Sequence, residues 1–141
     1  LKAEKYKKKK FDIILLIQPT SPLRTKKYIK NSLDLLIDNN ADSVWTCSKI
    51  NTKYHPLKVL QITKKNFLKP FFKKSLKIIA RQQLNEVYIR NGVCYTVNRN
   101  TIFNYQNLFG KKCIPLVIQK KIINIDNQKD LKLADKILKK S

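Results

Sequence analysis

Glycine is almost absent from this sequence, since only Gly92 and Gly110 occur among 141 residues. Two isolated glycines exclude the Gly-rich phosphate loops of the Walker and Rossmann types within the chain. Long apolar runs are also missing, and none approaches the roughly 20 residues that a membrane-spanning helix needs. Methionine does not occur at all, and the first residue is Leu1. We therefore expect a piece of a longer product, with no membrane association.

Acidic residues are scarce, with 9 against 31 basic residues and a formal net charge of +22. This excess of positive charge admits a basic nucleic-acid-binding module, whose affinity for oligonucleotides would fall steeply with salt. Arginine, which such proteins use for bidentate contacts, occurs only four times and leaves 27 lysines spread along the chain. Lysine, isoleucine and asparagine share A- and T-rich codons. Genome composition therefore explains the charge better, and we expect no nucleic-acid partner.

Zinc binding and thiol chemistry have little support in the sequence. Cys47, Cys94 and Cys113 are widely spaced without a CxxC pair, and His55 is the single histidine. This set excludes an ordinary zinc site, and no second histidine is present to activate a cysteine nucleophile. We expect reduced thiols, a cytoplasmic location, and His55 as a loop residue rather than a catalyst.

Apolar runs and helical periodicity predict an α/β protein. The run at 11–17 (FDIILLI) is typical of a parallel strand buried on both faces. A helix should begin at Thr25 and place Ile29, Leu33, Leu36 and Ile37 on one face, before a strand at 43–47. Strand, helix and strand within about 35 residues form a βαβ unit.

The rest of the chain predicts an excursion from that sheet and then a return to it. Residues 57–62 alternate as a half-exposed strand does, and the stretch up to Ile79 is predicted to be antiparallel. Further strands are expected at 92–97 and 114–118. Asn127 should cap a final helix with Asp130 at its third position, and its buried stripe is expected to comprise Leu131, Ala134, Ile137 and Leu138.

Two segments at strand ends could carry chemistry, because open α/β sheets bind ligands at the carboxyl ends of their strands. The first runs from Gln18 to Arg24 (QPTSPLR), where two prolines stiffen a loop that bears an amide, two hydroxyls and a guanidinium. A plain rigid turn, with the hydroxyls bonded to their own backbone, is an equally open interpretation.

The second segment is Asn124-Ile125-Asp126. Residues two apart in an extended chain point the same way, so Asn124 and Asp126 would present two oxygen ligands suited to Mg²⁺. When the segment is considered alone, a role of Asp126 in helping Asn127 to begin the helix is favoured over metal binding.

Five motifs in one order resemble those of the acylneuraminate cytidylyltransferases, the CMP-sialic acid synthetases. They are QPTSPLR at 18–24, HPLK at 55–58, RQQL at 81–84, Asn91-Gly92 followed by Tyr95, and INID-x-x-x-DL-x-x-AD at 123–135. The resemblance covers this whole chain but only the later part of the family domain, whose Gly-rich CTP loop lies upstream. It implies a Rossmann-like nucleotidyltransferase fold with a mostly parallel sheet. Residues 1–141 would be the C-terminal portion of one domain, with 55–79 as an antiparallel dimerisation insertion.

The resemblance also implies an activity. The family transfers CMP from CTP to a nine-carbon α-keto acid sugar with Mg²⁺ and releases pyrophosphate. Asp126 matches a catalytic, metal-binding acid, and Asn124 stands where the family has another aspartate, which removes one charge from the metal site.

The remaining matches concern the sugar. The positions that match sugar-contacting residues are Gln18, Asn91, Tyr95 and Phe109, the last beside the acyl group. Lys58 and Arg81 match basic residues that meet the sugar carboxylate from the partner subunit of a homodimer. Sialic, legionaminic and pseudaminic acids all fit the class, and KDO is a more distant option. A truncated, non-catalytic relic of the family remains an alternative, and the chain alone is expected to be inactive.

Overall fold

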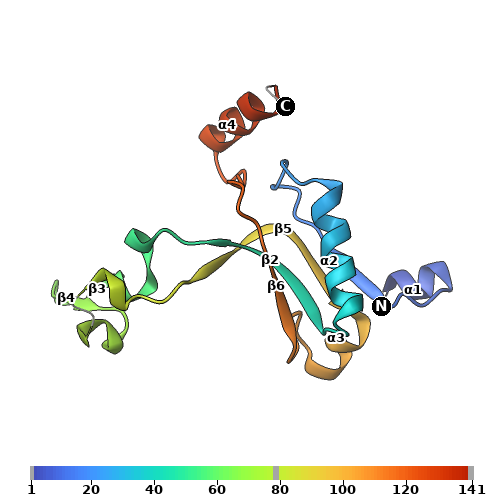
Figure 1. Cartoon of the computed structure of the whole chain (residues 1–141), viewed down its shortest axis with the longest axis horizontal. Helices are drawn as coiled ribbons and strands as arrows, with labels where there is room; N and C mark the ends of the chain where they lie inside the picture. The colour runs from blue at the N-terminus through green and yellow to red at the C-terminus, as the bar shows by residue number, and fades with distance from the viewer. Residues whose placement is uncertain (1, 78–79, 140–141) are drawn as a thin grey trace. The chain divides into compact units, whose positions relative to one another are not determined.

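The computed structural model describes residues 2–77 and 80–139 and divides into two compact units. One unit comprises Leu1–Ser48 with Arg90–Ser141, and the other comprises Lys49–Ile89. Figure 1 labels most of the helices and strands of both. The candidate loops after the first strand and before the last helix both lie in the first unit.

The first unit is built on a four-stranded sheet with the order β1-β5-β2-β6. The strands are β1 (Ile13–Leu16), β2 (Ser43–Lys49), β5 (Tyr88–Asn98) and β6 (Cys113–Val117). Strands β2 and β6 are parallel, with Ser43 opposite Cys113. Strands β1 and β5 are antiparallel, with Ile13 opposite Asn98.

Strand β5 also runs opposite to β2. The Asn98 amide donates to the Asp42 carbonyl at 2.9 Å, and further along β2 the Thr46 hydroxyl donates to the Cys94 carbonyl at 2.8 Å. Strands β1, β2 and β6 therefore share one direction and β5 is reversed between them. The predicted α/β class is confirmed. The two strands of the expected βαβ unit, β1 and β2, run in the same direction as predicted, but β5 lies between them.

The expectation of a first strand buried on both faces is wrong. Leu16 is 42% exposed and the following Ile17 is 39% exposed. Within the described residues β1 pairs only with β5, so its other edge carries no neighbouring strand. An apolar run is therefore compatible here with a strand that is only half covered.

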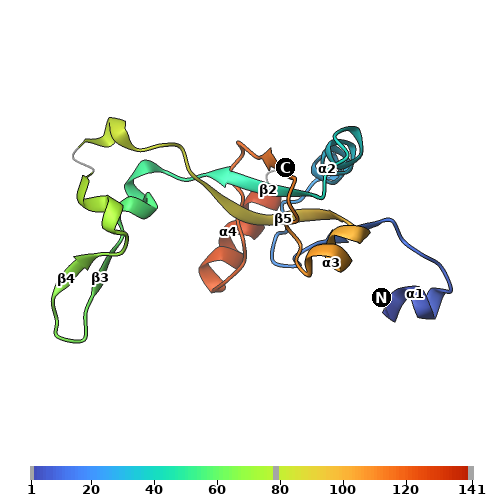
Figure 2. The same ribbon diagram turned by 90° about the horizontal axis from the view of Figure 1, so that it is seen from below.

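Helix α2 (Lys26–Asp38) covers one face of this sheet (Figure 2). Leu36 packs with Ala41 and Val44, and the Ser32 hydroxyl bonds that of Thr96 on β5 at 2.7 Å. The expected apolar face is only partly correct, because Ile37 at the last turn is 63% exposed. The two shorter helices of this unit are α1 (Lys2–Lys7) and α3 (Arg99–Tyr105).

The last helix, α4 (Gln128–Leu138), begins as predicted. The Asn127 side chain accepts from the amides of Lys129 and Asp130, and the Asp130 carboxylate accepts from the Asn127 amide. The predicted buried stripe is wrong at two positions, because Leu131 is 47% and Leu138 is 51% exposed while Ala134 is buried. The described residues leave the outer part of this stripe without a packing surface.

The second unit contains the predicted antiparallel excursion. Strands β3 (Leu60–Ile62) and β4 (Leu68–Pro70) form a hairpin in which Leu60 lies opposite Pro70. Short 3-10 turns surround it, namely η1 (Thr52–Tyr54), η2 (Pro56–Lys58), η3 (Lys73–Lys77) and η4 (Arg81–Gln83). Ile79, the predicted end of the excursion, lies outside the described residues. The role of 55–79 in dimerisation stays a prediction.

All three cysteines are free thiols, as expected. Burial raises the pKa of the Cys94 thiol, which therefore stays protonated and packs in the core with Val93 and Ile118. Among the described helices, none has the length and apolar character required to cross a membrane.

An ion pair joins helix α1 to the start of helix α3. The Arg99 guanidinium donates to both carboxylate oxygens of Glu4, at 2.6 and 2.9 Å, and the Phe11 amide donates to the same carboxylate. These contacts, Arg99 first, lower the pKa of Glu4 from 4.5 to about 2. The stabilisation is therefore complete above the unfolded-state pKa and is lost as the pH falls toward 2.

We expect the substitution Glu4→Gln to lower the thermal midpoint at pH 7 and to have progressively less effect as the pH falls from 4.5 toward 2. Thermal unfolding of both proteins between pH 2.5 and 7 measures this. A difference in Tm that stays constant across the range would contradict the pairing.

Candidate functional site

Strand β1 leads into the Gln18 loop, which meets Gly92 inside strand β5, where the buried part of that strand begins. A Cβ placed on Gly92 would meet the Gln18 Oε1 atom and would lie 3.1 Å from the Ser21 hydroxyl. Gly92 has φ of +73°, a left-handed conformation that side chains disfavour. The Asn91-Gly92 motif and the Gln18 loop, 74 residues apart, are thus in direct contact.

The second predicted segment joins the same cluster. The buried Ser21 hydroxyl donates to the Asn124 Oδ1 atom at 2.7 Å, and the Ile125 amide donates to the Thr20 carbonyl at 2.8 Å. The two segments predicted separately at strand ends therefore form one site, at the edge where β1 and β6 end.

Arg24 does not point toward a ligand, as the stiff loop had suggested. Its guanidinium donates to the Val93 carbonyl at 2.6 Å and to the Gln18 carbonyl. Arg24 therefore fastens the loop to β5. The interpretation as a plain turn is wrong for Ser21, whose hydroxyl donates to Asn124 and not to its own backbone.

Asn91 and Tyr95 are more buried than residues of an open binding surface. Asn91 is 5% exposed; its amide nitrogen donates to the Ser48 hydroxyl, and its oxygen accepts from the Val93 amide. Tyr95 is 4% exposed, and its hydroxyl accepts from the Gly92 amide at 3.1 Å. A hydroxyl that accepts can also donate, so Tyr95 can still offer a proton to a ligand. Asn91 therefore links β5 to Ser48 of β2, and its contact with a sugar stays a prediction.

Trp45 is a residue of this site that the sequence did not single out. Its ring centroid lies 4.6 Å from that of Tyr95 and 5.2 Å from that of Phe109. Its indole nitrogen donates to the Leu108 carbonyl at 3.0 Å. Phe109 is 53% exposed, so this aromatic row runs from the buried Tyr95 to an accessible ring. A single tryptophan in the strand at 43–47 was the available signal.

The metal-binding prediction rests on one carboxylate. Asp126 is exposed, whereas the Asn124 oxygen already accepts the Ser21 bond and brings no charge. Within residues 2–77 and 80–139, no group of three His, Cys, Asp or Glu side chains could hold a metal ion. Mg²⁺ commonly uses one or two carboxylates together with substrate phosphates, so Asp126 with a bound triphosphate fits that ion.

Lys58 and Arg81 lie in the second unit and are exposed. Lys58 ends the turn η2, where its amide donates to the His55 carbonyl at 2.8 Å, and Arg81 begins η4. These two residues stay predictions for a site that includes the Gln18 cluster.

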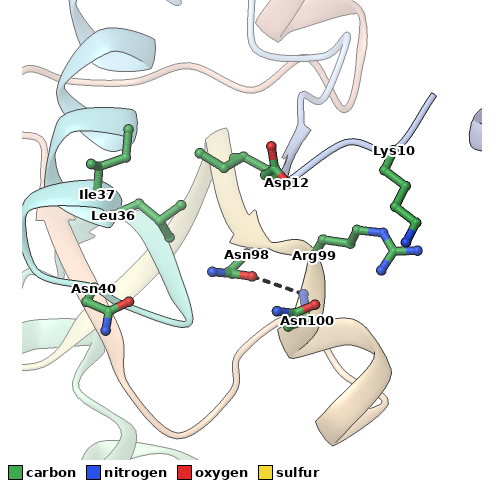
Figure 3. A pocket seen from close by; sticks show the side chains of 9 residues that line it. Lys10, Asp12, Leu36, Ile37, Asn40, Asn98, Arg99 and Asn100 are labelled. Atoms are coloured by element: carbon green, nitrogen blue, oxygen red, sulfur yellow. Dashed lines mark hydrogen bonds between the residues drawn. The ribbon is translucent and has the colours of Figure 1, made fainter.

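None of the predicted site residues lines a separate cavity of about 480 Å³. Figure 3 shows its lining, which includes Lys10 and Asp12 before β1, Leu36 and Ile37 of α2, and Asn98 at the end of β5. It is associated with the start of β1, whereas the Gln18 cluster follows the end of that strand. Volume alone therefore does not identify the functional site.

Comparison with known proteins gives two informative matches, whereas no protein-family model matches the chain. A CMP-N,N'-diacetyllegionaminic acid synthase of Legionella pneumophila is 27% identical over 130 residues, which cover 91% of this chain and 54% of that protein. The resemblance to the cytidylyltransferase family is confirmed.

The fold comparison agrees. The solved structure of a CMP:2-keto-3-deoxy-manno-octonic acid synthetase complexed with CTP matches with a TM-score of 0.63 at 13% identity, covering 98% of this chain and 66% of that one. At that identity the match shows the fold alone, and it confirms the expected nucleotidyltransferase architecture. The chain spans about half the length of the curated cytidylyltransferase relative that it matches.

Proposed function

We propose that this chain is part of a cytidylyltransferase that transfers CMP from CTP to an acidic sugar of the nonulosonic, sialic-type class and releases pyrophosphate. The observation that carries the proposal is the contact between the Gln18 loop and Gly92 at the strand ends, because it joins two family motifs at one edge. The legionaminic acid synthase, similar over 91% of this chain, supports a nine-carbon sugar.

The proposed chemistry uses the groups at that edge together with Phe109, whose carbonyl accepts from the Ser43 hydroxyl at the start of β2. The anomeric hydroxyl of the sugar attacks the α-phosphorus of CTP, and the bond to pyrophosphate breaks. Gln18 and the Tyr95 hydroxyl would bind and orient the sugar, with the exposed Phe109 ring against its acyl group. Asp126 would hold Mg²⁺ together with the phosphates, and the ion would offset the negative charge that develops on them.

The sugar carboxylate requires cations, and the proposal assigns these to Lys58 and Arg81 of a partner subunit in a homodimer. Arg81 offers two parallel donors that match a carboxylate. The second unit carries many exposed apolar side chains, which favours burial against another chain; they include Leu60, Ile62, Phe67 and Leu68. A cytoplasmic location, where CTP is available, is part of the proposal.

The experiment that tests the substrate class is pyrophosphate release by the full-length protein with CTP and a panel of acidic sugars. Sialic, legionaminic and pseudaminic acids should support turnover better than KDO, which has eight carbons. Turnover confined to KDO would place the enzyme in another branch of the family, and turnover with none would leave the non-catalytic alternative.

The metal role of the Asn124 segment makes a specific prediction. The substitution Asn124→Asp adds a charged ligand two residues from Asp126, so the Mg²⁺ concentration for half-maximal activity should fall by about tenfold. The Ser21 hydroxyl can donate to a carboxylate as it does to the amide oxygen, so the fold should be preserved. A magnesium titration of the rate measures the change.

Asn100→Asp is the matched control, because it adds the same charge at an exposed position outside the Gln18 and Asn124 segments, in the first turn of α3, where a helix accepts an acidic side chain. This control should leave the Mg²⁺ titration near that of the parent protein. Titration curves that coincide for Asn124→Asp and the parent protein would remove the metal role from this segment.

A further inference from the structure

The Phe109 ring is carried by an irregular loop at 106–112, between α3 and β6. Two side chains of β2 bond consecutive carbonyls of this loop. The Trp45 indole nitrogen donates to the Leu108 carbonyl at 3.0 Å, and the Ser43 hydroxyl donates to the Phe109 carbonyl at 2.6 Å. Both peptide groups that flank Phe109 are therefore attached to the sheet.

The rest of this loop is fixed by polar side chains. The Asn107 Oδ1 atom accepts from the backbone amides of residues 109–110, both at 2.8 Å. The Asp42 carboxylate accepts from the backbone amides of residues 111–112, also at 2.8 Å. A loop fixed in this way presents a side chain to a ligand without first having to be ordered by it.

Trp45 also contacts the Phe109 ring itself. The two ring planes meet at 73° with centroids 5.2 Å apart, an edge-to-face arrangement that stabilises aromatic pairs. The Tyr95 ring centroid lies 4.6 Å from that of Trp45, and Tyr95 is 4% exposed, so it gives the indole a buried support. Trp45 thus holds both the backbone and the ring of Phe109, which stays 53% exposed to a ligand.

The direction of the Trp45 side chain separates it from the core beneath α2. The preceding residue, Val44, packs with Leu36 of that helix, and successive side chains of a strand point to opposite faces of the sheet. The indole therefore lies on the face away from α2. A change at Trp45 should consequently affect the Phe109 loop more than the core that α2 covers.

We propose that Trp45 is a positioning residue that, by holding the Phe109 ring in place, makes the enzyme prefer acidic sugars that carry an acyl group. The inference rests on the proposed function, since the site must bind such a sugar. An acyl methyl group gains most from an apolar ring that is already in place, because ordering the ring during binding costs free energy. Phe109 would touch the sugar, whereas Trp45 acts through Phe109.

The test compares two sugars as substrates of the full-length protein with CTP. One is N-acetylneuraminic acid or N,N'-diacetyllegionaminic acid, whichever turns over faster, and the other has hydroxyl groups in place of its acylamino groups. The ratio of their kcat/KM values measures the preference. Trp45→Phe keeps a ring but lacks the indole N–H, so it should lower this ratio by about fivefold. Trp45→Leu also loses the ring contact and should lower it roughly 20-fold. The kcat/KM for the hydroxyl analogue and the KM for CTP should stay unchanged.

Two further variants separate positioning from stability. Leu35→Ala removes packing from the core beneath α2 and should lower Tm without changing the ratio. Phe109→Ala should remove the preference. Adding Trp45→Phe to Phe109→Ala should cause no further loss, because Trp45 acts through a ring that is then absent.

The outcomes distinguish this inference from the proposed function. A parent protein that turns over both sugars without preference, or Trp45 variants that keep the parent ratio, would overturn the inference alone. Equal losses of kcat/KM for both sugars, or effects of Trp45→Phe and Phe109→Ala that add, would also overturn it. A parent protein that turns over neither sugar would overturn the proposed function and this inference with it.

Discussion

Replacing Gly92 with alanine is expected to abolish sugar-dependent turnover while leaving a folded protein. The added Cβ would displace the Gln18 amide, whose Oε1 atom occupies its position, and would crowd the Ser21 hydroxyl. The left-handed backbone at φ of +73° adds a cost of about 1–2 kcal/mol, which for a chain of this size lowers Tm by roughly 3–8 °C. Thermal unfolding and steady-state kinetics of the full-length variant measure both effects.

Gly110→Ala is the matched control for this substitution. Gly110 has φ of +71°, and a Cβ there would lie within 3.0 Å of the Asp42 side chain rather than of a site residue. The Asp42 carboxylate accepts from the amides of Lys111 and Lys112, which lower its pKa, so displacing it should destabilise the protein at least as much. Gly110→Ala should nevertheless retain activity at permissive temperature. If the two variants lose activity in the same proportion to their fall in Tm, the loss in Gly92→Ala reflects stability alone. That result would contradict a specific role for Gly92.

The second large effect is expected at Arg81. If Arg81 binds the sugar carboxylate, Arg81→Ala leaves a charge without its partner, which costs about 2–4 kcal/mol and lowers kcat/KM for the sugar roughly 30- to 1000-fold. Lys58→Ala should act in the same direction with a smaller loss, because a lysine makes no bidentate contact. The KM for CTP should change little. Lys69→Ala removes one exposed charge from the same unit and is the control.

Mixing of variants tests whether Arg81 acts across a dimer. Each site is proposed to take Gln18 from one subunit and Arg81 from the other. A mixed dimer of a Gln18→Ala chain and an Arg81→Ala chain therefore contains one site in which both residues are intact and one site in which both are replaced. Random reassociation of the two inactive proteins should therefore restore roughly a quarter of the parent activity. If the subunits exchange but the mixture recovers no activity, Arg81 acts in the site of its own subunit or in no site.

The sequence was sufficient for the features that local chemistry determines. Asn127 and Asp130 form the predicted capping box, and the helix after Thr25 and the strand at 43–47 occur where periodicity places them. Both depend on residues within one turn or one strand of each other. The order of the five motifs likewise indicated the resemblance that the 27% identity to a CMP-N,N'-diacetyllegionaminic acid synthase supports.

Long-range pairing could not be predicted in the same way. The insertion of β5 between β1 and β2 depends on partners about 80 residues apart, such as Ile13 and Asn98, and leaves Leu16 more exposed than its apolar neighbourhood suggested. The exposure of Leu131 and Leu138 depends on which surfaces meet α4, which helical periodicity does not specify.

The site shows the same division. The Gln18 and Asn124 segments were placed at strand ends from the sequence, but their junction through Ser21 follows only from the fold. One of the two open interpretations of the loop directed the Arg24 guanidinium toward a ligand, whereas in the structure it holds the loop through two backbone carbonyls. Trp45 required the contact with Tyr95 to be noticed at all.

The proposed reaction is best tested by ³¹P NMR of the products that the full-length protein forms from CTP, Mg²⁺ and legionaminic or sialic acid. We predict pyrophosphate and a CMP phosphodiester to the anomeric oxygen of the sugar, in equal amounts and only when both substrates are present. Formation of CDP with orthophosphate, of CMP without a sugar adduct, or of no product in the presence of folded protein would contradict it.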